Sequence, residues 1–297
     1  MAGQEFYSVY RAYFQHHDYA NRFVMDALDR AGEFAGKDDI FRVECAKKGS
    51  AYQNVWMYVI REMEDAIMDC QAGCQQCNDD PVHAWDEAVA FYAGSLEGRE
   101  GSASGKLLYR LAEKRCANFG TCTGAAAKSA VNAQIIDEFR LGQYALNQGK
   151  CVEAIPRKKR IVELMSVPLV QGALRYAYKI GELNGGSKEI AEGVAFTLAI
   201  LPRIAACDSN AAALIRANMG LDATSRMKDG FVEVKRAFER TYACMGITCA
   251  DIGGILQNED IPNIYWPLAE PCATQTPNTI PNAGWLCEGE ASLRIDL

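Results

Sequence analysis

One short string occurs twice in this chain. Glu-Ala-Val-Ala-Phe at residues 87–91 recurs as Glu-Gly-Val-Ala-Phe at residues 192–196. Three further matches keep the same order along the chain: Ala-Leu at 27–28 and 145–146, Val-Glu at 43–44 and 162–163, and Ala-Asn-x-Gly at 117–120 and 217–220. Matches in one register are the mark of an internal repeat. The chain is therefore predicted to contain two tandem copies of one unit.

The repeated unit is predicted to be helical. Apolar residues recur three or four positions apart through most of the chain, as at Ile60, Met63 and Ile67, which is the spacing of one helix face. Alternation of the kind that marks strands is nearly absent. We therefore expect an all-α fold, in which the two repeats pack about a pseudo-two-fold axis.

The predicted boundaries follow from the matches. Repeat 1 is placed at residues 5–125 and repeat 2 at residues 128–250. Because 43 residues separate Glu44 from Glu87 but 29 separate Glu163 from Glu192, repeat 1 is expected to hold an insertion, placed at residues 70–80. Residues 251–297 contain five of the nine prolines and are predicted to form an irregular wrap over one compact body.

Composition limits the partners. The formal charge is −7 and the pI is near 5.2, which argues against nucleic acid, because binding phosphates requires a basic face. No stretch approaches 18 consecutive apolar residues, so no membrane span is expected, and the first thirty residues do not have the pattern of a signal peptide.

Twelve cysteines are more than a cytosolic protein usually carries, and they predict disulfides in an oxidising compartment. Cys116 and Cys122, like Cys244 and Cys249, bracket short turns, and Cys272 and Cys287 lie in the proline-rich tail. Cys70, Cys74 and Cys77 have a spacing that also suits zinc, so a metal knuckle stays open for these three beside disulfides.

The repeated glutamate is the residue that packing does not explain. A carboxylate on a partly buried helix needs a partner or a metal. His83 and Glu87 lie four residues apart, so one helix face presents an imidazole and a carboxylate. Glu87, Glu192, Glu44 and Glu163 around the axis, with His83 to one side, would suit iron, manganese or calcium. The alternative is that the His83 and Glu87 pair is a surface ion pair and that the glutamates form salt bridges.

Catalysis is not expected. The chain has no nucleophile-elbow or zincin pattern, and its three histidines leave little material for acid–base chemistry.

Three strings carry a family resemblance: Trp-Asp-Glu-Ala-Val-Ala-Phe-Tyr-Ala-Gly-Ser-Leu-Glu-Gly at residues 85–98, Gly-Lys-Leu-Leu-Tyr at 105–109, and Leu-Ala-Glu-Lys-Arg-Cys-Ala-Asn-Phe-Gly-Thr-Cys at 111–122. With them the chain resembles the low-iron-inducible periplasmic proteins, or iron-assimilating proteins, of algae and related protists. The resemblance implies a secreted, periplasmic or cell-surface helical protein that binds iron outside the cell. It also implies Asp86 and Glu87 as candidate iron ligands.

The sequence is therefore compatible with two functions. The first is a non-catalytic, extracytoplasmic iron-binding protein of iron assimilation. The second is a structural or interaction protein without a metal, such as a coat component or a peripheral subunit of a membrane assembly. Its partner would dock on aromatic residues of the tail, around Tyr265, Trp266 and Trp285.

Overall fold

The computed structural model describes residues 5–74, 80–97 and 104–272, and helices dominate it. The prediction of an all-α fold is confirmed. The first unit contains α1 (Glu5–Phe14), α2 (Tyr19–Asp29), the 3₁₀ turn η1 (Gly32–Phe34), α3 (Asp39–Gly49), the π-helical segment η2 (Ser50–Val55), α4 (Trp56–Gln71), α5 (Pro81–Ala93) and α6 (Leu108–Phe119). The antiparallel strands β1 (Cys122–Thr123) and β2 (Lys128–Ser129) form a short hairpin. The remaining helices are α7 (Ala130–Asn147), α8 (Cys151–Glu182), α9 (Ser187–Cys207), α10 (Ser209–Met219), α11 (Gly230–Glu239), α12 (Tyr242–Met245) and α13 (Cys249–Ile252).

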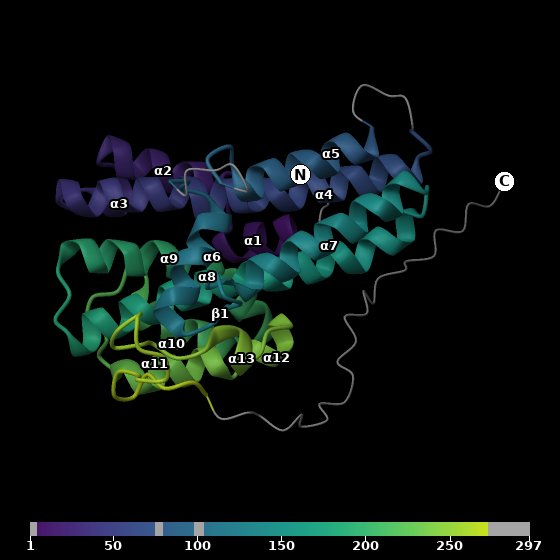
Figure 1. The fold of residues 1–297 in the computed structure, drawn as a ribbon. Helices are drawn as coiled ribbons and strands as arrows, with labels where there is room; N and C mark the ends of the chain where they lie inside the picture. The colour runs from purple at the N-terminus through teal and green to yellow at the C-terminus, as the bar shows by residue number, and fades with distance from the viewer. Residues whose placement is uncertain (1–4, 75–79, 98–103, 273–297) are drawn as a thin grey trace.

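The helices pack in layers (Figure 1). Helices α2 to α5 form one layer, α10 to α13 lie on the opposite side, and α7, α8 and α9 run between them. Helix α9 contacts α3, α8 and α10, so it occupies the centre of the body. The core therefore lies between segments that are far apart in the sequence.

Local sequence explains where several helices begin. Asp38 accepts a hydrogen bond from the Phe41 amide at the start of α3, and Asp80 accepts from the Val82 and His83 amides at the start of α5. These carboxylates pair amides that have no partner inside the helix. Pro81 at the first position of α5 has no amide hydrogen to leave unpaired.

The four matched strings fall on helices that follow one another in the same order in the two predicted units. In each, a helix is followed by a long helical segment, by the helix with the repeated string, and by a shorter helix. In the first unit α3, η2 and α4 run on without a break, and in the second unit α8 alone has 32 residues. The pseudo-two-fold axis and the predicted unit boundaries stay predictions.

Helix α9 is the one described helix that is long and apolar enough to cross a membrane, with a mean hydropathy of 1.6 in its most apolar window. Of that window, 67% is buried inside the protein, as in the core helix of a globular body. The close packing of α8 on α9 requires a glycine, because a Cβ at Gly172 would lie 2.6 Å from the Phe196 ring.

Four disulfides join described cysteines, which confirms a disulfide-bonded protein. They are Cys70–Cys151, Cys116–Cys122, Cys207–Cys244 and Cys249–Cys272. Cys116 and Cys122 pair with each other because only a short turn separates them, as their spacing predicts. Cys244 and Cys249, by contrast, do not pair with each other, because each faces a cysteine that the fold brings from elsewhere. Cys45 is a free, buried thiol.

The cysteine cluster that begins at Cys70, near the end of α4, is disulfide-bonded where it is described. Cys70 pairs with Cys151 at the start of α8, and Cys74 is also in a disulfide. These two thiols are therefore not zinc ligands. Residues 75–79 of the predicted insertion, with Cys77 among them, lie outside the described residues, as does the tail residue Cys287.

The predicted C-terminal wrap is described as far as residue 272. After α13 the chain has little regular structure apart from a bridge between Leu256 and Tyr265. Trp266 packs against Tyr178 of α8, with their ring centroids 5.9 Å apart. The predicted docking residue Trp266 is thus half-buried against the helical body, and Trp285 lies outside the described residues.

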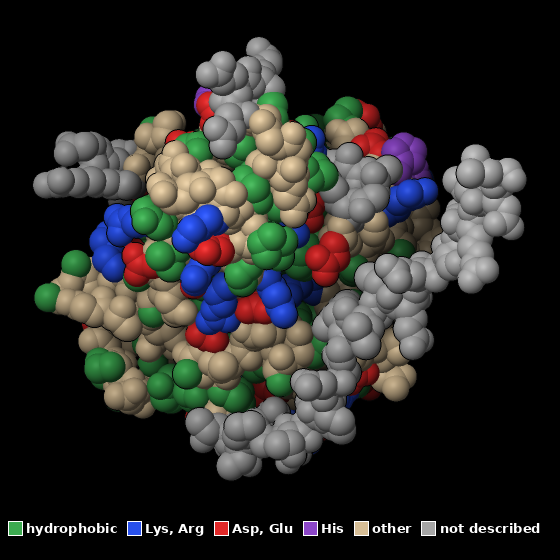
Figure 2. Space-filling view, turned by 90° about the vertical axis from the view of Figure 1, so that its right-hand side faces the viewer, with side chains coloured by type: hydrophobic (Ala, Val, Ile, Leu, Met, Phe, Trp, Pro, Cys, Tyr) green, Lys and Arg blue, Asp and Glu red, His purple; other side chains and the backbone are tan. Residues whose placement is uncertain are grey.

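The surface carries mixed charge in spite of the net charge of −7. Figure 2 shows lysine and arginine side chains gathered near the middle of one face, with aspartate and glutamate side chains among them. Ion pairs between helices fit this pattern, such as Arg157–Glu138 at 3.2 Å and, below the surface, the largely buried Lys158–Glu64 at 3.3 Å.

Candidate functional site

The predicted residues of α5 lie on the surface. His83 Nε2 is 3.4 Å from Glu87 Oε1, and the two side chains are 61% and 43% exposed. Asp86 accepts a hydrogen bond of 2.7 Å from Gln143 of α7. Between them, Trp85 is fully buried and donates to the Phe139 carbonyl. Trp85 of the string at 85–98 thus fixes α5 on α7, while Glu87 of that string and the preceding His83 face outward.

Glu44 and Glu192 come together on one cation. The Lys48 ammonium lies 2.6 Å from Glu44 on the same helix and 2.6 Å from Glu192 of α9, and all three side chains are largely buried. Burial opposes the charge on Lys48, but hydrogen bonds and charges from both carboxylates outweigh it and raise the pKa of Lys48. Lys48 lowers the pKa of Glu44 against the effect of burial.

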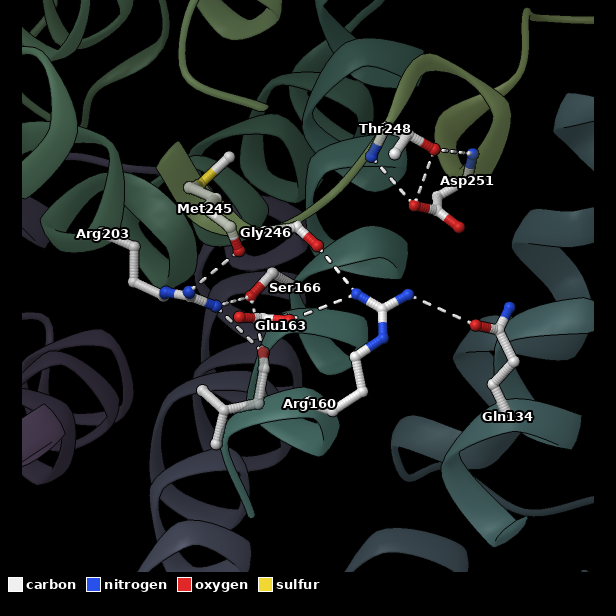
Figure 3. Close-up of polar contacts among 10 residues, drawn as sticks. Gln134, Arg160, Glu163, Ser166, Arg203, Met245, Gly246, Thr248 and Asp251 are labelled. Atoms are coloured by element: carbon white, nitrogen blue, oxygen red, sulfur yellow. Dashed lines mark hydrogen bonds and ion pairs between the residues drawn. The ribbon is translucent and has the colours of Figure 1, made fainter. Parts of the chain in front are cut away.

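Glu163 belongs to a separate polar network, shown in Figure 3. It pairs with Arg160 at 3.2 Å, and Arg160 also donates to the Gly246 carbonyl at 2.8 Å. The half-buried Arg203 donates to the carbonyls of Val162 and Met245. These contacts fasten the turn after α12 to α8 and α9, which is a structural role.

The six predicted metal ligands therefore form three separate groups. His83 and Glu87 are paired, with Asp86 beside them; Glu44 and Glu192 share Lys48; Glu163 lies apart. Among the described residues, no three His, Cys, Asp or Glu side chains are grouped so that they could hold a metal ion. Metal binding at these residues stays a prediction.

A cavity of about 510 Å³ opens beside the Lys48 and Glu192 pair. It is lined by α3 and η2, by α6, by the C-terminal part of α8, by α9, and by the loop after α13. Five of its lining residues are cationic: Lys48, Arg110, Lys114, Arg115 and Arg175. Three are acidic: Glu113, Glu192 and Glu259. We call this cavity the basic pocket.

Stacked aromatic rings support the basic pocket. Tyr52 and Tyr176 flank Phe196, with ring centroids 5.0 and 5.8 Å from it. Tyr52 belongs to η2, the π-helical segment, and such segments are frequent at functional sites. The guanidinium carbon of Arg115 lies 5.7 Å from the Phe196 ring centroid, and that of Arg175 lies 5.7 Å from the Tyr176 ring centroid. The rings hold both guanidinium groups by cation–π contact.

Arg115 is the buried charge of the basic pocket. It is 7% exposed, donates to Asn118 at 2.5 Å, and leaves its buried Nε without a hydrogen-bond partner among the described atoms. Burial, together with the nearby charge of Arg175, lowers its pKa from 12.5 to about 10. Burial also lowers the pKa of Lys114, and neighbouring cations, Arg110 first, add to the effect.

The acidic residues of the basic pocket do not neutralise these cations by contact. Glu192 is paired with Lys48, Glu113 accepts from Asn132, and Glu259 accepts from Asn118. In the part of the chain that the structure describes, Arg110, Lys114, Arg115 and Arg175 have no carboxylate within ion-pair distance. The basic pocket therefore carries excess positive charge and can attract an anion.

Sequence reasoning did not identify the basic pocket. The run Glu-Lys-Arg-Cys-Ala-Asn at 113–118 lies within the resembling strings, but served there only to indicate the family. Its one visible signal is the repeated Ala-Asn. Asn118 contacts Arg115 and Glu259, and its counterpart Asn218 is fully buried and contacts Asp229.

The model of a family described as low iron-inducible periplasmic protein matches residues 14–276. No curated protein and no solved structure is significantly similar to the chain. The match covers most of the sequence and includes all the residues that line the basic pocket. Disulfides are typical of an oxidising, extracytoplasmic compartment, as the family description requires. The chain therefore belongs to the low iron-inducible periplasmic protein family.

Proposed function

We propose that this protein binds iron outside the cytoplasm during iron assimilation and catalyses no reaction. Membership of the low iron-inducible periplasmic family supports the link to iron. The disulfides and the family description agree on an extracytoplasmic location. Iron is the cargo in this proposal.

The convergence of Glu44 and Glu192 on one cation carries the proposal. These two of the six predicted ligands come from different units, lie largely buried, and both reach within 2.6 Å of the Lys48 nitrogen. Carboxylate oxygens are hard ligands that suit highly charged cations. An iron ion entering here competes with the Lys48 ammonium for the same oxygens.

Iron retention by the purified protein tests the proposal. The metal-free full chain is equilibrated with ferric nitrilotriacetate, desalted and analysed for bound iron, beside the double variant Glu44→Gln/Glu192→Gln. Glu153→Gln serves as a control, because Glu153 is 61% exposed and pairs with the exposed Lys150 of its own segment. We expect the parent and the control to retain iron and the double variant to lose it.

The variants Glu87→Ala and His83→Ala test the surface pair of α5 in the same assay. Loss of iron in these variants alone would move the site to α5. Equal iron in every protein would exclude all these residues as ligands, and a parent that retains no iron would contradict the proposed function.

The salt bridges of Glu44, Glu192 and Glu163 favour a second function, an interaction protein without a bound metal. In that case the same assay finds no iron on the parent. The half-buried Trp266 gives little support to docking through the described part of the tail, because its ring packs on Tyr178.

A further inference from the structure

The basic pocket has more cations than its own carboxylates neutralise. Among the described residues, Lys48 is the one lining cation that has an ion pair, and Arg110, Lys114, Arg115 and Arg175 have none. Four like charges around one cavity repel one another and are hydrated poorly where they are buried. A bound anion would relieve both effects.

Arg115 gives the anion a specific contact. Its guanidinium is buried, is held over the Tyr176 and Phe196 rings, and makes a hydrogen bond to Asn118. One of its buried donors, Nε, has no partner among the described atoms. The protein therefore does not use all the hydrogen-bonding capacity of this guanidinium, and Arg115, which lines the basic pocket, can still donate to an anion there.

We infer that the basic pocket binds a small organic anion with two or more carboxylate groups, held by the guanidinium groups of Arg115 and Arg175. A guanidinium matches a planar carboxylate with two parallel hydrogen bonds. The cavity of about 510 Å³ lies in the range of small-molecule pockets, and the rings of Tyr176 and Phe196 can contact a carbon skeleton. Lys48, Arg110 and Lys114 are available to further carboxylates.

This inference rests on the proposed function only where it concerns iron. Glu44 and Glu192 supply few of the oxygen ligands that iron takes, and a polycarboxylate in the adjoining cavity can supply the rest. The basic pocket is then the site for iron that arrives as a carboxylate chelate. Binding of the free anion does not require iron, so it can be measured separately.

Calorimetric titration of the metal-free full chain with citrate tests the inference. Arg175→Gln is the principal variant, because Arg175 is half-buried and makes no hydrogen bond to protein among the described residues. Lys159→Gln is the matched control, since Lys159 lies on the same helix, is exposed and has no ion pair in the described structure. We expect citrate to bind the parent and Lys159→Gln alike and Arg175→Gln at least ~10-fold more weakly.

Arg115→Gln should abolish citrate binding, and circular dichroism establishes whether that variant is folded. If it does not fold, Arg110→Gln replaces it, and we expect weaker binding there too. Inorganic phosphate is titrated in parallel. Failure of citrate to bind the parent, equal binding by Arg175→Gln and Lys159→Gln, or tighter binding of phosphate than of citrate would each overturn the inference.

The two proposals fail in different ways. Iron retention without citrate binding would overturn the polycarboxylate site and leave the iron function standing. Citrate binding with no retention of iron would contradict the iron function and leave the anion site standing.

Discussion

The Nζ atom of Lys48 lies 2.6 Å from Oε1 of Glu192 and thereby joins α3 of the first unit to α9 of the second. The pair lies at the edge of the basic pocket. It explains the repeated glutamate in one unit only, since Glu87 pairs with His83 on the surface. The repeated glutamate therefore has two different environments: Glu192 is largely buried against Lys48, and Glu87 is on the surface beside His83.

Replacing Lys48 by methionine should destabilise the protein. The change leaves Glu44 and Glu192 largely buried without their shared cation, which we expect to lower the free energy of unfolding by about 3 kcal/mol at pH 7. Urea denaturation measures the loss. Lys47→Met is the control, because Lys47 is 64% exposed and pairs with Glu44 at 3.3 Å, so its loss should be below about 1 kcal/mol.

The pH dependence of stability should reverse in that variant. In the parent, Lys48 lowers the pKa of Glu44, so this contribution to stability is present above the unfolded pKa and is lost as the pH falls through the folded one. Without Lys48, burial becomes the main effect on the Glu44 carboxyl and raises its pKa. The folded protein then takes up a proton there more readily than the unfolded chain, so stability should recover as the pH falls from 7 toward 5. Denaturation curves at several pH values decide between these signs. A parallel decline of both proteins with falling pH would contradict the explanation.

The disulfide between Cys70 and Cys151 should contribute more stability than the local one. It joins the end of α4 to the start of α8 across a sequence separation of 81, whereas Cys116 and Cys122 are separated by 6. The chain-entropy account gives about 4.5 kcal/mol for the long loop and about 2 kcal/mol for the short one. The paired Cys→Ser variants are compared by urea denaturation. Peptide mapping without reductant checks the pairing.

Alanine at Gly142 should disturb the packing of Trp85, the first residue of the string at 85–98. A Cβ there would lie 2.1 Å from the Trp85 ring, which is fully buried and hydrogen-bonded to the Phe139 carbonyl. We expect Gly142→Ala to lower the free energy of unfolding by about 2 kcal/mol or more, as overpacking does. Gly186→Ala is the control, because its Cβ meets nothing closer than 4.0 Å. Equal thermal stability of the two variants would contradict this packing.

Anion binding by the basic pocket should weaken at high pH. Burial lowers the pKa of Arg115 to about 10, so its guanidinium is charged at neutral pH and begins to lose its proton near that value. Citrate affinity should therefore be steady between pH 7 and 8.5 and fall as the pH rises through about 10. It should also fall with added salt, since the attraction is electrostatic. Titrations at fixed ionic strength across this pH range, with far-ultraviolet dichroism as a check on folding, measure the effect.

The sequence by itself determined the elements of this protein. Helical spacing of apolar residues predicts the all-α fold, because each helix needs one apolar stripe for the core. The order of four matched strings reflects the common order of helices, and the cysteine content predicts disulfides. Cys116–Cys122 was predictable from sequence because its loop is short.

The tertiary structure decided the partners. Cys249 pairs with Cys272 and not with Cys244, because α12 packs against α9, which ends at Cys207, and Cys244 pairs there instead. Glu192 meets Lys48 because α9 crosses α3, and no local pattern encodes that crossing. The residues that line the basic pocket come from several helices and a loop. In the sequence, its lysines and arginines look like ordinary solvent-exposed residues. Only packing brings Arg115 and Arg175 to one cavity, because long-range contacts depend on how whole helices cross.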